Sequence, residues 1–237
     1  FAFAVSFVII FSIFSSLGLP TVVTRFGAIY HIKDNWAKLK GILQYSNKYV
    51  TIWSIAIMAI VSIILISDVF VIPSRTYVFI ALPIILFLSL STIRTGILTA
   101  IEKVNFSQLP EMIIRPVLFF ILIIILYYSE ILNAYSAVIS YTIINGIIFL
   151  VGFYLVKKFT DKQLSNVEPS YEISAWKKSA LPLFFLGSIQ VFGAQADILI
   201  LGLLADSEEV GIFKSMYQIS LLVIFSLTAV NAIASPY

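Results

Sequence analysis

The chain has 237 residues, of which 60% are hydrophobic and only 11% are charged, and its formal net charge is +3. A soluble domain would carry roughly a quarter charged residues, so the composition excludes that class and favours a membrane protein. With no cysteine and a single histidine, it also argues against disulfides, thiolate chemistry and a metal centre, and no cofactor is expected.

Seven uncharged, apolar stretches predict seven transmembrane helices. About 20 apolar residues cross the hydrocarbon core as a helix, and most of the stretches reach or approach that length. In chain order, the helices are expected at residues 1–24, 43–67, 76–98, 112–128, 132–156, 179–204 and 211–235. Pro20, Pro83 and Pro182 fall inside or at the entry of these stretches, where each can kink its helix. The predicted fold class is an all-α, polytopic membrane protein.

The basic residues alternate between the connections, and this alternation predicts an orientation. Of the 15 lysines and arginines, all except Arg75 and Lys214 gather around alternate connections. Short connections rich in Lys and Arg stay cytoplasmic, so segments 25–42, 99–111 and 157–178 are predicted to be cytoplasmic. The positive excess then follows from topology, and no nucleic-acid partner is expected.

Segment 157–178 is the longest polar segment and carries both signs of charge. It is predicted to link an N-terminal lobe, residues 1–156, to the start of a second lobe, residues 179–237. The first lobe would hold five helices and the second would hold two. Because the chain opens inside an apolar stretch with no initiator methionine, we interpret it as an internal part of a larger membrane protein.

Asp197 is the most costly residue to place in a membrane, because it lies inside an otherwise uncharged stretch. An acid at that depth costs on the order of 2.5–3.5 kcal/mol and usually faces a bundle interior or a water-filled cavity. Gln190 lies seven residues earlier and shares its face, whereas Ser188 and Gln195 lie on roughly the opposite side. Asp197 either faces a cavity and binds a cation, a proton or a polar substrate, or only holds neighbouring helices together.

Three cations are candidates for binding an anionic substrate: Arg25 and Arg94 at predicted cytoplasmic helix ends, and Lys214 near the outer mouth. A guanidinium can hold a phosphate through paired hydrogen bonds. The alternative is that both arginines are topology anchors whose side chains reach the headgroups. The sequence contains no Walker A loop, G-x-S-x-G or H-E-x-x-H motif, so no catalytic activity is predicted.

Two segments resemble oligosaccharide flippases of the Wzx type. The first, from Leu17-Gly18-Leu19-Pro20-Thr21 to Thr24-Arg25-Phe26, is similar to the end of the family's second helix. The second includes Gln195-Ala196-Asp197 and Leu201-Gly202 and continues to Glu208-Glu209-Val210-Gly211-Ile212-Phe213. It is similar to the family's seventh helix, turn and eighth helix, with Phe213 where Tyr is commoner. The resemblance covers the chain as helices two to eight of twelve.

That family belongs to the multidrug/oligosaccharidyl-lipid/polysaccharide exporter superfamily. The resemblance implies a MATE-like, two-lobe transporter that works by alternating access in a bacterial or archaeal plasma membrane. Its substrate would be an undecaprenyl-pyrophosphate-linked oligosaccharide for surface polysaccharide such as O-antigen or capsule. Cationic side chains would hold the pyrophosphate, and Arg25 matches the family's motif position. Other glycan-assembly membrane proteins are expected partners.

The driving force and the competing functions stay open at this point. No ATPase is encoded, so a coupling cation, sodium or a proton, is one expectation, and Asp197 is the first candidate to bind it. The alternatives are a drug/cation antiporter of the same superfamily, a glycan polymerase or ligase, and a structural membrane scaffold. The absence of acidic residues at mid-depth in the first five predicted helices favours an anionic substrate over a cationic drug.

Overall fold

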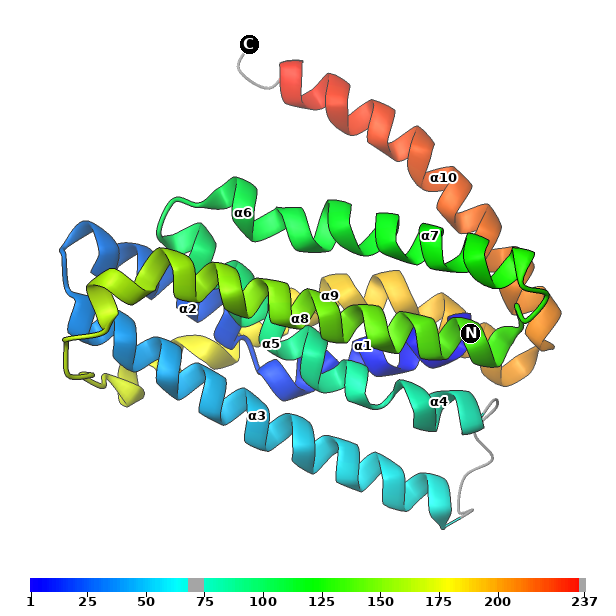
Figure 1. Cartoon of the computed structure of the whole chain (residues 1–237), viewed down its shortest axis with the longest axis horizontal. Helices are drawn as coiled ribbons and strands as arrows, with labels where there is room; N and C mark the ends of the chain where they lie inside the picture. Colours follow the sequence, from blue (N-terminus) through cyan, green and yellow to red (C-terminus); the bar gives the residue numbers. More distant parts are fainter. Residues whose placement is uncertain (68–74, 235–237) are drawn as a thin grey trace.

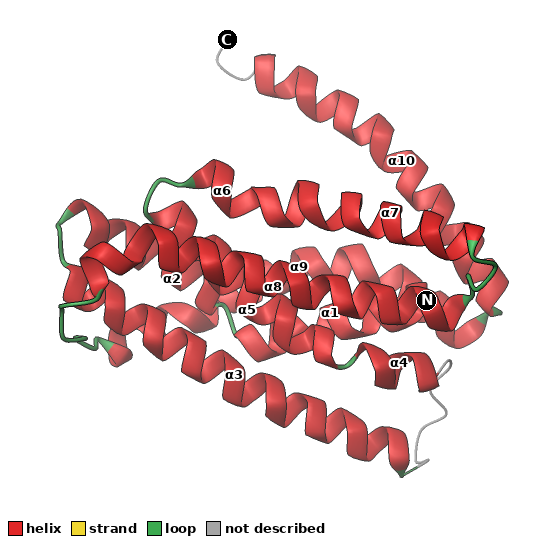
Figure 2. Ribbon diagram, in the orientation of Figure 1, coloured by secondary structure: helices red, strands yellow, loops and turns green. Residues whose placement is uncertain are grey.

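The computed structural model describes residues 1–67 and 75–234, with side chains up to Leu221 except that of Ser207. In the described ranges the chain is a bundle of helices without strands (Figures 1 and 2). The elements are α1 Ala2–Ser16, α2 Leu19–Ile32, α3 Trp36–Ile66, α4 Arg75–Ala81, α5 Pro83–Ala100, α6 Val104–Leu109, the π-helical turn η1 Pro110–Ile114, α7 Arg115–Tyr128, α8 Ala134–Leu164, α9 Ile173–Leu204 and α10 Ser207–Ala234.

The described part of the chain has five helical segments that are long and apolar enough to cross a membrane. They are Trp36–Ile66, Arg75–Ala100, Val104–Tyr128, Ala134–Leu164 and Ile173–Leu204. The bent pair of α1 and α2 passes the same test as one broken span, and α10, with 28 residues, matches the last predicted helix. The predicted all-α, polytopic membrane fold is confirmed. Most of the predicted connection 68–75 and the end of the 211–235 helix lie outside the described residues.

The first predicted helix, 1–24, is wrong as a single element. It breaks at Leu17 and Gly18, which have φ values of 42° and 74°, and α2 leaves the break at 48° to α1. Pro20 occupies the first turn of α2, where its missing N–H is not needed. A left-handed glycine that ends one helix and a proline that starts the next therefore turn the chain inside an apolar stretch.

The segments predicted to be cytoplasmic are largely helical, so the helices extend beyond their predicted ends. Helices α2 and α3 occupy most of segment 25–42, α6 and η1 occupy the end of 99–111, and α8 and α9 reduce the 157–178 linker to residues 165–172. Hydropathy marks where the hydrocarbon core ends, whereas a helix continues for as long as its residues favour it. Lys, Gln and Leu are good helix formers, so the helices extend beyond the apolar stretches.

Helix α5 lies in the middle of the bundle (Figure 1) and packs against α1, α2, α3 and α8. It buries residues on several sides, including Ile84, Ile93 and Ile97. Helix α7 packs on α8 and η1 and fully buries none of its own side chains. Helix α10 contacts the ends of α9 and α1 and then diverges from the other helices (Figure 1).

A group of polar contacts fixes the linker to the corner between α2 and α3. Lys38 Nζ lies 2.5 Å from Glu172 Oε1, and the Tyr30 hydroxyl donates to Glu172 Oε2 at 2.5 Å. The indole Nε1 of buried Trp176 donates to the Tyr30 oxygen at 3.0 Å. We call Tyr30, Lys38, Glu172 and Trp176 the linker clamp. The hydrogen bonds from Lys38 and Tyr30 lower the pKa of Glu172 below its ordinary value, because they favour the charged carboxylate. The clamp holds the start of α9 against α2.

Candidate functional site

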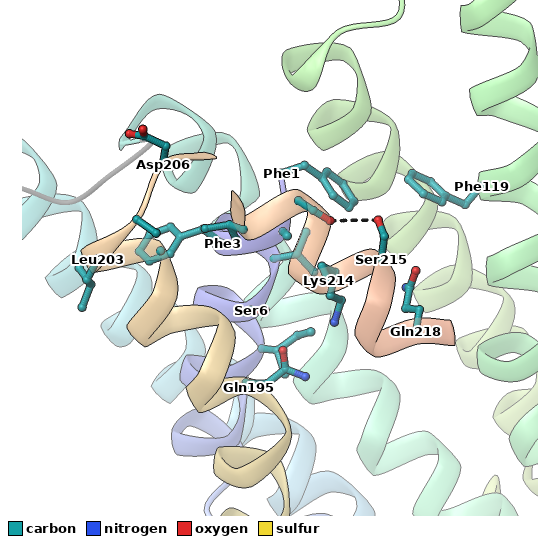
Figure 3. Close-up of a pocket in the computed structure, with 17 residues that line it drawn as sticks. Phe1, Phe3, Ser6, Phe119, Gln195, Leu203, Asp206, Lys214, Ser215 and Gln218 are labelled. Carbon is teal, nitrogen blue, oxygen red and sulfur yellow. Dashed lines mark hydrogen bonds between the residues drawn. The ribbon is translucent and has the colours of Figure 1, made fainter. Parts of the chain in front are cut away.

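A cavity of about 630 Å³ lies where α1, α9 and α10 meet (Figure 3). The cavity lies at one end of the bundle, and the distribution of basic residues predicts that this end faces the outside of the cell. Its polar lining consists of Ser6, Gln195, Asp206, Lys214, Ser215 and Gln218, and its aromatic lining of Phe1, Phe3 and Phe119. A cavity of this size with a few polar groups on an apolar wall has the usual character of a ligand site.

The turn between α9 and α10 brings the polar residues together. Gln195 lies nine residues before the end of α9, and Lys214 lies seven residues after the start of α10. At 1.5 Å per residue both are about 10–14 Å from the turn, so the two antiparallel helices place them at similar depth. The turn is stabilised by Glu208 and Glu209 in the first turn of α10, where the helix dipole favours acids.

Among the described residues that line this cavity, Lys214 is the only one with a cationic side chain. Its amine has no carboxylate oxygen within 4 Å among the described residues. Figure 3 shows that the carboxylate of Asp206 points away from it. The nearest recorded partner of Lys214 is the Tyr217 ring, whose centroid is 5.6 Å from Nζ. An uncompensated ammonium in a half-enclosed space attracts an anion more strongly than one in bulk water.

Neutral polar groups surround the amine. The side-chain oxygen of Gln195 is buried and has no hydrogen-bond partner in the described part of the chain. Ser6 is also buried, and the Ser215 hydroxyl donates to the Gly211 carbonyl at 2.9 Å (Figure 3). A buried acceptor without a partner carries a desolvation penalty that a ligand hydroxyl or N–H removes. The cavity therefore offers one positive charge and at least one unused amide.

Arg94 lies apart from this cavity, between α5 and α8. It is only 6% exposed, its Nη1 donates to the Phe149 carbonyl at 2.7 Å, and its Cζ lies 3.7 Å from the centroid of the Phe149 ring. Arg25 is exposed on α2. The structure therefore does not bring Arg25, Arg94 and Lys214 into one cationic cleft.

The family model described as "Polysaccharide biosynthesis protein" matches residues 1–237. The chain belongs to the polysaccharide biosynthesis protein family. No curated protein and no solved structure matches it. The family match covers every helix described above, so the cavity is a feature of a polysaccharide biosynthesis protein with multiple membrane spans.

In this polysaccharide biosynthesis protein, Asp197 and Gln190 lie on the exposed face of α9. They share that face, as their spacing predicts, but neither lines the cavity of Lys214 and Gln195. The described residues contain no group of three His, Cys, Asp or Glu side chains placed to hold a metal ion. The suggested role of Asp197 in binding a coupling cation stays a prediction.

Sequence reasoning missed several polar lining residues of the polysaccharide biosynthesis protein, among them Ser6, Ser215 and Gln218. Gln218 follows Lys214 by one helical turn, so its position on the same face of α10 was readable from the spacing alone. Ser6 carried no such signal, because α1 contains three other buried serines, Ser12, Ser15 and Ser16, that do not line the cavity. Ser6 lines the cavity because α1 packs against α9 and α10, and this packing is not visible in the sequence of α1.

Proposed function

We propose that this protein moves a lipid-linked oligosaccharide from the cytoplasmic to the outer leaflet of a bacterial or archaeal plasma membrane. The lipid carrier would be undecaprenyl pyrophosphate, and the product would supply surface polysaccharide synthesis. The family match supports a role in polysaccharide synthesis or export, and the membrane-spanning helices supply the setting. The structural observation that carries the proposal of an anionic substrate is Lys214, a cation that lines a cavity and has no carboxylate partner among the described residues.

In this proposal each part of the cavity has a chemical role. The Lys214 ammonium attracts a phosphate oxygen, and the amides of Gln195 and Gln218 accept from and donate to sugar hydroxyls. The lipid tail stays in the bilayer while the polar headgroup crosses between the helices, as in alternating access. Lys214 would repel a cationic drug at this site, so drug/cation antiport is supported less well. The proposal involves no covalent chemistry, and a sodium ion or a proton is the proposed coupling ion.

The test is complementation of a bacterial strain that lacks its own flippase, with the full-length protein and its variants. Lys214→Gln should strongly reduce surface polysaccharide, whereas Lys214→Arg should restore a large part because it keeps the charge. Lys178→Gln is the matched control, since Lys178 is exposed on α9 and does not line the cavity. Equal surface polysaccharide in Lys214→Gln and Lys178→Gln, at equal protein levels, would contradict the role of the cavity.

A further inference from the structure

A second cavity, of about 360 Å³, lies between α3, α5 and α8. Three basic residues, Lys40, Arg94 and Lys157, line it together with one acid, Asp161. Its remaining lining is partly polar, with Gln44, Asn47 and Thr160, and partly apolar, with Leu43, Phe153 and Val156. We call this space the basic cavity. It is separate from the cavity of Lys214, because no residue lines both.

Arg94 contributes a buried cation that has little to bind. A guanidinium carries five N–H donors, yet among the described residues Arg94 makes one hydrogen bond, to the Phe149 carbonyl. The ring of Phe149 covers one face of the guanidinium at 3.7 Å. A charge that is buried without a counter-ion is costly unless a ligand compensates it. The remaining donors are available to a ligand in the basic cavity.

The two lysines add charge at the rim of the same space. Lys40 donates from Nζ to the carbonyls of Leu164 and Val167, both at 2.7 Å, and so stabilises the C-terminal end of α8. Lys157 is exposed. In the described part of the chain, none of the three cations of the basic cavity has a carboxylate oxygen within 4 Å. The cavity has three positive groups and one negative group, which favours an anion.

The position of the basic cavity along the helices indicates which anion reaches it. Arg94 lies six residues before the end of α5, and Lys157 seven before the end of α8, or about 9–11 Å from those ends. These helix ends are predicted to face the cytoplasm, so the basic cavity lies near the level of the lipid phosphates in the cytoplasmic leaflet. Beside the cavity, α8 exposes Leu150, Phe153 and Tyr154, so acyl chains can lie along the helix.

We propose that the basic cavity binds the phosphate group of an anionic membrane lipid at the cytoplasmic leaflet. Basic spaces between transmembrane helices on this side are suited to such headgroups. Arg94 supplies paired donors to the phosphate oxygens, Lys157 supplies a second charge, and Gln44 and Asn47 can hydrogen-bond the rest of the headgroup. This lipid is distinct from any transported substrate, so the proposal does not depend on flippase activity.

The test is a thermal-shift titration of the purified full-length protein in detergent. The ligands are dioctanoyl phosphatidylglycerol, dioctanoyl phosphatidylcholine and inorganic phosphate, and the rise in Tm with concentration gives an apparent Kd. Lys157→Glu and Lys158→Glu are a matched pair, because they are exposed neighbours on α8 with the same change of charge and only Lys157 lines the cavity. Arg94→Gln is the third variant.

We expect phosphatidylglycerol to raise Tm more than phosphatidylcholine. Lys157→Glu should weaken its binding by roughly tenfold and Arg94→Gln by at least as much, whereas Lys158→Glu should keep it within about twofold. A similar dependence on Lys157 with inorganic phosphate would support the phosphate site and identify a free anion as a second source. Equal binding to Lys157→Glu and Lys158→Glu would overturn the proposal, even if Arg94→Gln does not fold.

Discussion

Replacing Gly18 by alanine should destabilise the junction between α1, α2 and α9, because an added methyl group has no room there. Gly18 has a φ of +74°, and a Cβ built on it would lie 2.4 Å from the Ala180 carbonyl oxygen and 2.6 Å from the Phe184 nitrogen. Both atoms belong to the backbone of α9, so no side-chain rotation relieves the contact. Either α9 retreats or the break changes its conformation.

The cost has two parts. Holding alanine in the left-handed region costs roughly 1–2 kcal/mol. Restoring an ordinary contact of about 3.4 Å from 2.4 Å requires a shift of about 1 Å, and overpacking of that kind typically costs about 1–3 kcal/mol. The free energy of unfolding of Gly18→Ala should therefore fall by roughly 2–5 kcal/mol.

Gly193→Ala is the matched control, since Gly193 lies within α9 and a Cβ there would meet nothing within 4 Å. That variant should be neutral or more stable by up to about 1 kcal/mol, because alanine is the better helix former. Reversible unfolding of the purified protein in mixed detergent micelles measures both variants. If the two had the same stability to within about 0.5 kcal/mol, the close approach of the break to α9 would be refuted.

The other predictions concern the linker clamp and the start of α8. Glu172→Gln should lower stability by at most about 1 kcal/mol, because the Lys38 and Glu172 side chains are 32% and 37% exposed. The folded protein lowers the pKa of Glu172, so the stability that its carboxylate contributes should be complete above the ordinary pKa of about 4.5 and be lost as the pH falls through the lower folded pKa. In Glu172→Gln, the plot of Tm against pH should lack this acid-dependent fall. A plot with the same shape as that of the wild type would contradict the prediction. Trp176→Phe removes the N–H that donates to the Tyr30 oxygen, and in the same unfolding assay it should lower the free energy of unfolding by about 1–2 kcal/mol. An unfolding midpoint equal to that of the wild type would argue against this hydrogen bond. Asn133→Ala removes the reciprocal cap at the start of α8 and should cost about 1 kcal/mol, seen as faster amide hydrogen exchange in residues 134–138; unaltered exchange there would rule out the cap.

The all-α fold and the approximate location of the helices followed from the sequence, because hydropathy reports directly on the length of chain in the bilayer. The helix ends did not follow. The break at Leu17 and Gly18 depends on two residues in the left-handed region, and leucine at such a position has no sequence signature. Helix α8 continues to Leu164, beyond the apolar stretch that ends at residue 156, because charged residues interrupt hydropathy without interrupting a helix.

The candidate site was only partly predictable. Lys214 was singled out as a cation near the outer mouth and Gln195 as part of a second polar line on its helix, and the hairpin of α9 and α10 brings them to one cavity. Asp197, which has the stronger signal, lies on the exposed face of α9. Periodicity separates the two faces of a helix, but it does not indicate which face packs against another helix. That choice is made by tertiary contacts with α1, which the pattern of one segment does not contain.

The linker clamp also has a consequence for how the protein is made. Tyr30 and Glu172 are 142 positions apart in the chain. At a synthesis rate of roughly 5–20 residues per second, the ribosome needs about 7 to 28 s to reach Glu172 after it has incorporated Tyr30. During that interval the corner between α2 and α3 lacks its final partner, so the clamp closes as a late step in biogenesis, after the earlier helices have been synthesised.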